Sequence, residues 1–381
     1  MTTRLLLAFG CIVLGVVPTA EAGNESERSI DASNQVVFPL RWQQPLVREG
    51  THRTLSFTMG RPAVSNRHEL VIVGTGERRL IALSTRSGSE IWAKDFPAEL
   101  EAFGGIGVQK SGQEVALFSS RDGIFHCVGT DTGVTLWSVT LSAESRAEPN
   151  VLPEGVLVTN AQSELVLLDI ENGKRIWSKR RTPPSGMTVL GHSRPLIFKG
   201  RAYVGFSDGY VAAFDIKTGK EIWAMPASLN QDKFADVDAD PVLIDGQLIV
   251  ASYSSGIVSL DPENGKRNWS QAAKAVNRLA GDHQRLFAAS GDGLVWRLNP
   301  KDGSVVYRVR LDNGPVSRMT LKGNLLTFAG GPNGLVVLDA LSGKPLQATA
   351  MRGGANSDPN WSDLGIFVLS NRGDLYAFDV R

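Results

Sequence analysis

The sequence predicts an all-β protein, an eight-bladed β-propeller of four-stranded antiparallel blades that is closed by pairing of its N- and C-terminal strands. Three observations predict this fold. A unit of about 40 residues recurs along the chain, each unit ends in a short strand that usually carries Trp, and the two ends of the chain hold complementary parts of one unit. Periods of this length with four strands per unit are typical of propeller blades.

The repeating unit is clearest in the middle of the chain. An alternating strand ends in Asp, a Gly-Lys turn follows, and a short strand then carries Trp, as in 165–177, 211–223 and 257–269. Weaker copies end at Trp92, Trp137, Tyr307 and Gln347. The turn glycines are 38 to 46 residues apart, at Gly88, Gly133, Gly173, Gly219, Gly265, Gly303 and Gly343.

The fifth copy shows how one unit supplies four strands. Residues 241–244 form the first strand, and the dipeptide Asp245-Gly246 favours a tight hairpin with positive φ. Residues 247–253 and 257–260 form the second and third strands, and the fourth ends at Trp269. Because an indole ring buries a large apolar area, we expect this Trp to pack between neighbouring blades.

The number of blades follows from the two ends of the chain. The third-strand motif occurs eight times, and its last copy, 374–379, has no fourth strand after it. The segment 40–42 near the N-terminus looks like an unpaired fourth strand that carries Trp42. We therefore expect Val37–Gln43 to pair with the C-terminal strands, which would close one propeller domain over residues 35–381 and remove exposed strand edges.

The N-terminal residues 1–22 are typical of a secretory signal peptide. Arg4 precedes an apolar run over 5–17, and Ala20-Glu21-Ala22 is a small-x-small cleavage site. Residues 23–34 are polar and are predicted to form a flexible leader. The two cysteines are Cys11 and Cys127, so cleavage would leave Cys127 alone, without an internal disulfide. Lipidation of Cys11 stays open, although the residues around it fit a lipid-attachment site poorly.

Charge and motifs exclude several classes of function. The chain has 40 Lys and Arg against 39 Asp and Glu, whereas a dedicated nucleic-acid-binding protein normally has a basic face. The five histidines are scattered, and the sequence contains no Cys-x-x-Cys, nucleophile elbow or phosphate loop. We therefore predict no catalytic residues, no metal ligands and no cofactor. The glycine-rich stretch 104–107 lacks the context of a phosphate-binding motif and is predicted to be a loop.

One acidic segment, Asp236-Val237-Asp238-Ala239-Asp240, stands out. Its start resembles a calcium-binding loop, but Pro241 and Gln247 occupy the positions that need Gly and a bidentate Glu. Two interpretations stay open. The segment is either a solvated inter-blade loop or an exposed loop that docks a partner.

Loop geometry favours a partner-binding surface here. The segments 179–194 and 224–240 join successive blades, so we expect them to lie side by side on the same face of the propeller. The first segment offers the apolar residues Met187, Val189 and Leu190, and the second offers the carboxylates. An apolar patch beside fixed charges suits protein recognition.

The Asp-x-x-x-Gly-Lys-x-x-Trp core resembles the pyrroloquinoline-quinone-type propeller repeat, and 234–269 resembles the BamB family, the propeller subunits of the outer-membrane β-barrel assembly machinery. This resemblance implies a non-catalytic scaffold at the periplasmic side of the outer membrane. It implies that Asp236 and Asp238 bind the periplasmic domains of the barrel-forming subunit. Nascent outer-membrane proteins are a second class of candidate partner. Met187 and Val189 match the family's other contact segment, whereas Leu190 stands where the family has Arg.

The same repeat leaves two alternatives open. One is a quinone-dependent dehydrogenase, although the chain lacks the adjacent cysteines and the calcium site that the alcohol dehydrogenases of this class possess. The other is a propeller that binds another ligand, such as a glycan.

Overall fold

The computed structural model describes residues 36–47, 60–100, 104–181, 193–227, 236–311 and 314–380. The predicted signal peptide and flexible leader lie outside these residues. Within them the chain forms the strands β1 to β32, and no helix in the described part is long and apolar enough to cross a membrane.

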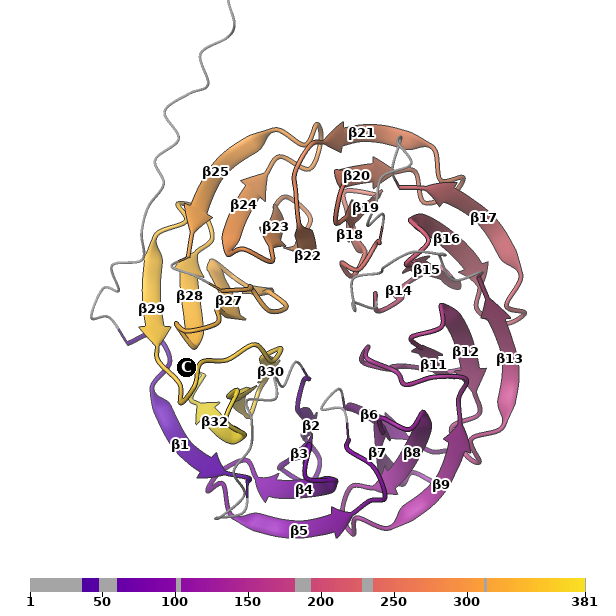
Figure 1. Ribbon diagram of the computed structural model, residues 1–381, viewed down its shortest axis with the longest axis vertical. Coiled ribbons are helices and arrows are strands. Elements are labelled where there is room, and N and C mark those ends of the chain that lie inside the picture. The colour runs from indigo at the N-terminus through magenta and orange to yellow at the C-terminus, as the bar shows by residue number, and fades with distance from the viewer. Residues whose placement is uncertain are drawn as a thin grey trace, which may run out of the picture.

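These strands form eight four-stranded antiparallel sheets that stand as blades around a central axis (Figure 1). The innermost strands, in blade order, are β2 (Ala63–Ser65), β6 (Gly105–Val108), β10 (Asn150–Leu152), β14 (Leu196–Phe198), β18 (Val242–Ile244), β22 (Val276–Gly281), β26 (Thr320–Lys322) and β30 (Asn360–Ser362). The second strands are β3 (Leu70–Gly74), β7 (Glu114–Ser119), β11 (Gly155–Thr159), β15 (Arg201–Gly205), β19 (Gln247–Ser252), β23 (Leu286–Ser290), β27 (Leu325–Ala329) and β31 (Gly365–Leu369).

The third strands are β4 (Arg79–Ser84), β8 (Ile124–Gly129), β12 (Glu164–Leu168), β16 (Tyr210–Asp215), β20 (Gly256–Leu260), β24 (Leu294–Leu298), β28 (Leu335–Asp339) and β32 (Asp374–Phe378). The outer strands are β5 (Glu90–Asp95), β9 (Thr135–Thr140), β13 (Arg175–Arg180), β17 (Glu221–Pro226), β21 (Arg267–Gln271), β25 (Val305–Arg310), β29 (Pro345–Thr349) and, for the eighth blade, β1 (Leu40–Pro45). The predicted fold class is confirmed.

The core consists of apolar layers between neighbouring blades. The second and third strands are apolar on both faces and almost wholly buried, as in β11 and β12. Leu157, Leu165 and Leu167 of blade 3, for example, pack against Ala202 and Phe214 of blade 4. A strand covered on both faces reads as a continuous apolar run, which explains the Val-, Ile- and Leu-rich stretches of the repeat.

Aromatic residues of the outer strands connect each blade to the next, as the repeat predicted. The Trp177 ring packs on Gly219 of the following blade, and its indole N–H donates to the Ile216 carbonyl at 2.8 Å. Gly219 has φ +65°, and a Cβ there would lie 2.6 Å from the ring. Both the backbone conformation and the close contact therefore require glycine at this position. We call this set of contacts the outer girdle. Its pairs are Trp42–Gly88, Trp92–Gly133, Trp137–Gly173, Trp177–Gly219, Trp223–Gly265, Trp269–Gly303 and Tyr307–Gly343.

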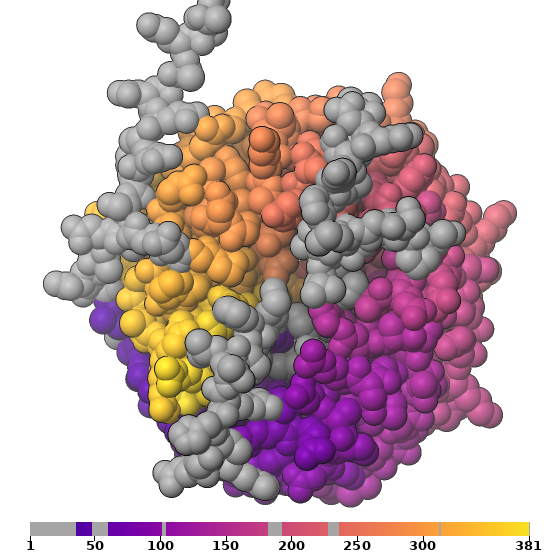
Figure 2. All heavy atoms as spheres, viewed as in Figure 1, coloured from indigo at the N-terminus to yellow at the C-terminus, as the bar shows by residue number. Residues whose placement is uncertain are grey.

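The eighth blade is completed by the N-terminal strand. β1 pairs antiparallel with β32, so Trp42 lies opposite Ala377, and the indigo start of the chain lies beside its yellow end in Figures 1 and 2. The strand begins at Leu40, later than the predicted Val37. The reason is that the backbone N–H groups of Val37 and Phe38 donate to the Gln347 side chain of blade 7, at 2.8 and 2.7 Å. Gln347 thus takes the place of an aromatic residue at the closing junction.

The prediction of a loop at 104–107 is wrong, because Gly105–Val108 is the innermost strand of blade 2. Its glycines reflect close packing. A Cβ at Gly104 would lie 2.4 Å from Phe118, and one at Gly105 would lie 2.7 Å from Pro149. Glycine in a strand often marks such a close approach.

Candidate partner-binding site

The acidic segment lies between blades 4 and 5, directly before β18. Val237 anchors it, because this side chain is buried among Tyr203, Leu248 and their neighbours in the layer between the two blades. The Val237 N–H donates to the Phe206 carbonyl of blade 4 at 3.2 Å, and the Asp236 carbonyl accepts from Tyr253 N–H of blade 5 at 3.0 Å. The segment is therefore bonded to both blades.

A glycine of blade 4 makes room for this segment. A Cβ at Gly205, the last residue of β15, would lie 2.4 Å from the Val237 carbonyl oxygen and 2.5 Å from its Cγ1. Any larger residue would push the segment out of the groove between the blades. Gly205 was not identified from the sequence, where its only signal was a glycine inside an apolar strand.

The expectation of an exposed, solvated loop is wrong for Asp236 and Asp238. Their exposed fractions are 1% and 6%. Val237 causes this burial, because its apolar side chain draws the backbone between the blades and its neighbours follow. A carboxylate that loses water in this way needs hydrogen bonds or a nearby cation to remain charged.

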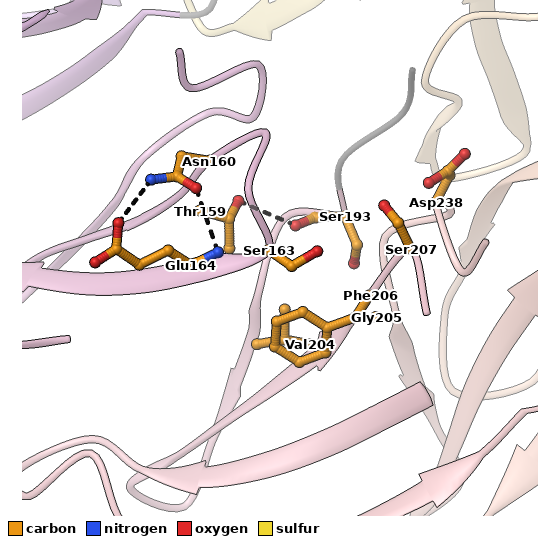
Figure 3. Close-up of a pocket in the computed structure, with 10 residues that line it drawn as sticks. All are labelled: Thr159, Asn160, Ser163, Glu164, Ser193, Val204, Gly205, Phe206, Ser207 and Asp238. Carbon is orange, nitrogen blue, oxygen red and sulfur yellow. Dashed lines mark hydrogen bonds between the residues drawn. The ribbon is translucent and has the colours of Figure 1, made fainter. Parts of the chain in front are cut away.

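Asp238 lines a small polar pocket with a volume of about 10 Å³, roughly the space that one water molecule needs. Figure 3 shows Asp238 at one end, Asn160 and Glu164 at the other, and Ser193 and Ser207 between them. The pocket thus collects hydroxyl, amide and carboxyl groups from the ends of three neighbouring blades.

The Asp238 carboxyl is the least satisfied group of this pocket. Its Oδ2 atom is buried and has no hydrogen-bond partner among the described residues. The pKa of Asp238 is raised to about 7, chiefly by burial and next by the negative charge of Asp236, while the positive charge of Arg278 opposes the rise. A buried acceptor of this kind gains much from a donor that reaches it, because an unmet hydrogen bond costs about 1–3 kcal/mol.

The two predicted loops meet here, as far as the structure describes them. The backbone N–H of Arg194, at the end of the first loop, donates to Asp240 Oδ1 at 2.7 Å. Ser193 lines the same pocket as Asp238. Met187, Val189 and Leu190 lie outside the described residues, so their predicted place beside the carboxylates stays a prediction.

No set of three or more His, Cys, Asp or Glu side chains in the described part of the chain could hold a metal ion. Asp236 and Asp238 are the predicted site residues that the structure brings together, and Gly205, Ser193 and Asp240 join them. The arrangement offers hydrogen-bond acceptors, and it suits a donor group from another molecule.

Comparison with known proteins adds a family to this geometry. The family model described as outer membrane protein assembly factor BamB matches residues 101–309 and 291–381, well over half of the chain. The crystal structure of BamB from Moraxella catarrhalis superposes with a TM-score of 0.75 at 18% identity, and the match covers 90% of this chain and 100% of that one. That likeness supports the propeller fold.

Three relatives are similar in sequence. The outer membrane protein assembly factors BamB of Nitrosomonas eutropha and Shewanella oneidensis are 28% and 22% identical over 221 and 218 residues, 55% and 54% of this chain. The aligned part of the chain spans about half the length of each, 50% and 54%. The quinohemoprotein alcohol dehydrogenase ADH IIB of Pseudomonas putida is 27% identical over 180 residues, which are 47% of this chain and 20% of that protein.

Proposed function

Because this chain belongs to the outer membrane protein assembly factor BamB family, we propose that it is a non-catalytic scaffold that assists the assembly of β-barrel proteins into the outer membrane. The family match carries this proposal, since it spans blades 2 to 7 and the strands β30 to β32 of the eighth blade. The protein works in the periplasm, at the inner face of the outer membrane. Its partner is the barrel-forming subunit of the assembly machinery, which it binds through that subunit's periplasmic domains.

We propose that the acidic segment is the docking site. Asp238 has a buried oxygen without a partner, and the segment is held rigidly between two blades. A basic or backbone donor of the partner at the mouth of the polar pocket hydrogen-bonds to the Asp238 carboxyl, and charge-assisted bonds of this kind are short and strong. Met187, Val189 and Leu190 supply apolar contacts next to it. Binding to a preorganised site loses less conformational entropy.

The test is the affinity for the purified periplasmic domains of the barrel-forming subunit. The variant Asp236→Asn with Asp238→Asn keeps the side-chain shape inside the groove, whereas alanine would leave cavities there. Losing one partner of a buried charged pair costs about 2–5 kcal/mol, so the variant should bind more than tenfold more weakly, a factor worth about 1.4 kcal/mol.

Asp245→Asn is the matched control. Asp245 is exposed in the β18–β19 hairpin of the same blade, at the opposite face, and its φ of +49° suits Asn equally well. It should bind like the wild type. If the double variant also keeps the wild-type affinity while folded, the docking role of these two residues is refuted.

A second candidate function is quinone-dependent dehydrogenation, which the similarity to the Pseudomonas putida enzyme favours. Titration with pyrroloquinoline quinone and calcium, followed by dye reduction with alcohols or sugars, distinguishes the two functions. We expect neither saturable binding nor turnover. Saturable binding with activity would replace the scaffold by an enzyme.

A further inference from the structure

Charged residues occupy one equivalent position in seven blades, near the start of the innermost strand. In blade 5 this position is Asp240, three residues before Leu243, which pairs with Leu248. The same count from the equivalent strand pairs gives a charged residue in six further blades, and we call these seven residues the axial ring. Its members are Arg61, Glu148, Arg194, Asp240, Arg278, Arg318 and Asp358. The eighth position, Phe103, lies outside the described residues.

Glu148 is the centre of this ring. Its Oε2 atom accepts from three guanidinium groups, those of Arg61 at 2.6 Å, Arg318 at 2.7 Å and Arg194 at 2.9 Å. Blades 3 and 7 stand on opposite sides of the ring in Figure 1, so the Glu148–Arg318 bond spans the axis. Burial alone would raise the pKa of Glu148, but Arg61, Arg318 and Arg194 hold it at about 2. Glu148 is therefore charged at every physiological pH.

Arg318 links this centre to the acidic segment. Its Nη1 bonds to Glu148, while its Nη2 bonds to Asp240 Oδ2 at 2.5 Å. Its own backbone N–H donates to Asp358 Oδ1 at 2.7 Å, which fixes the residue that reaches across. The donors of the planar guanidinium are arranged in a rigid fork, so the group holds two carboxylates in a fixed geometry.

Asp240 is the last residue of the candidate docking segment, two residues after Asp238. It is held on both oxygens, by Arg318 on Oδ2 and by the Arg194 N–H on Oδ1. The side chains of Arg318 and Asp240 are 18% and 29% exposed, so water competes only weakly for these bonds. The segment is thus fixed at Val237 by apolar packing and at Asp240 by charge.

We propose that Arg318 is a positioning residue for docking, which holds Asp238 in its binding geometry from blade 7, two blades further around the axis, through its ion pair with Asp240. This inference rests on the proposed function, since it concerns the same docking site. A buried charged network adds little stability over an apolar one of equal volume, because desolvation offsets the attraction. Its bonds are directional, however, so they fix where the segment lies. Packing at Val237 alone leaves the far end of the segment free to shift.

Arg318→Met tests this role, because Met keeps most of the apolar stem and removes the charge. We expect about tenfold weaker binding to the periplasmic domains of the barrel-forming subunit. We also expect faster hydrogen exchange at the Val237 and Tyr253 amides, which bond across the segment. Combined with Asp238→Asn, the substitution should add little further loss of affinity, because a residue that acts through Asp238 has no effect once that carboxylate is gone.

Arg285→Met is the matched control. Arg285 is equally shielded, with a 16% exposed side chain, and it bonds to Asp282 and to Gly323 of the next blade. It lies at the hairpin turns of the opposite face. We expect a similar loss of thermal stability with wild-type affinity and wild-type exchange at Val237 and Tyr253.

Wild-type affinity and exchange in folded Arg318→Met would overturn the inference, and so would full additivity with Asp238→Asn. If Arg318→Met does not fold, Asp240→Asn takes its place, since it keeps the acceptor for Arg194 and removes the charge that Arg318 grips. If the wild-type protein itself does not bind the periplasmic domains, the proposed function fails. The exchange at Val237 and Tyr253 still decides whether Arg318 positions the segment.

Discussion

The outer girdle and the axial ring are both sets of inter-blade contacts, but they are built differently. The girdle repeats one chemical solution seven times, an aromatic ring on a glycine, with Trp N–H bonds of 2.8 to 3.0 Å to the next blade. In the axial ring only the position in the blade is repeated, and the residue there is Arg, Glu or Asp in no regular order. The girdle therefore fixes the propeller in a uniform way, whereas the ring can make one sector of the axis different from the rest.

Removing β1 should have the largest effect, because it breaks the girdle at its closing junction. A chain that lacks 37–45 loses the partner strand of β32, the Trp42–Gly88 contact and the acceptors and donors that meet Gln347. The exposed edge of β32 then invites association with other chains. We expect loss of cooperative melting by circular dichroism and aggregation in size-exclusion chromatography. A monomer with wild-type melting would contradict the closure.

Glu148→Gln tests the axial ring. It leaves three guanidinium groups without their shared carboxylate, and breaking a buried ion pair typically costs about 3–5 kcal/mol. Urea unfolding should show this loss at pH 7. The control Glu263→Gln removes an exposed ion pair with Arg201, where the Glu263 side chain is 56% exposed, so it should cost less than about 1 kcal/mol.

The contribution of Glu148 to the stability of the folded state should also depend on pH. Its pKa of about 2 lies below the 4.5 of an ordinary Glu, so the folded state holds fewer protons than the unfolded state between these values. The stabilisation is present above pH 4.5 and is lost as the pH falls toward 2. The difference in free energy of unfolding between the wild type and Glu148→Gln should shrink as the pH falls from 4.5 toward 2. A difference that stays constant would contradict the role of the ion network.

Gly219→Ala separates backbone strain from the girdle contact. Its left-handed φ of +65° alone costs about 1–2 kcal/mol for a residue with a Cβ, and the new Cβ also clashes with the Trp177 ring. Gly246→Ala is the matched control, because Gly246 has φ +74° with no atom within 4 Å of a Cβ. Urea unfolding should show a larger loss in free energy of unfolding for Gly219→Ala than for Gly246→Ala. Equal losses would mean that the Trp177–Gly219 contact does not contribute to stability.

Asp238→Asn should stabilise the folded state relative to the wild type, by an amount that grows with pH. The pKa of about 7 lies above the usual 3.8, so the folded state binds more protons between these values and wild-type stability falls as the pH rises through 7. Asn carries no such penalty. The melting temperature of Asp238→Asn relative to wild type should therefore be higher at pH 8 than at pH 5. An equal difference at both pH values would mean that Asp238 is not buried as described.

The contrast between girdle and ring also explains what the sequence could predict. The girdle residues recur at fixed spacing, so the number of blades and the pairing of the Trp42 strand followed from the pattern. The axial-ring residues occupy the same position in each blade but differ in residue type. The Glu148–Arg318 bond also joins residues that are 170 positions apart in the chain. No local pattern points to such a bond.

The acidic segment 236–240 shows the same limit. Its acidic residues were conspicuous, so the sequence drew attention to Asp236 and Asp238, and the structure places Asp238 in one pocket with Ser193 of the neighbouring loop. Their burial was not predicted, because it depends on Val237 packing onto Gly205, 32 positions away in the chain. The strand at 105–108 was missed for a related reason, since Gly104 and Gly105 make room for Phe118 of the same blade and for Pro149 of the next blade.

Affinity purification from detergent-solubilised membranes tests the central claim most directly. The tagged full-length protein, its Asp236→Asn with Asp238→Asn variant and the Asp245→Asn control would be expressed at equal levels, and co-purifying proteins identified by mass spectrometry. We predict that the barrel-forming subunit is recovered in near-equal amount with the wild type and the control, and is largely lost with the double variant. Recovery of the wild type without that subunit would contradict the account.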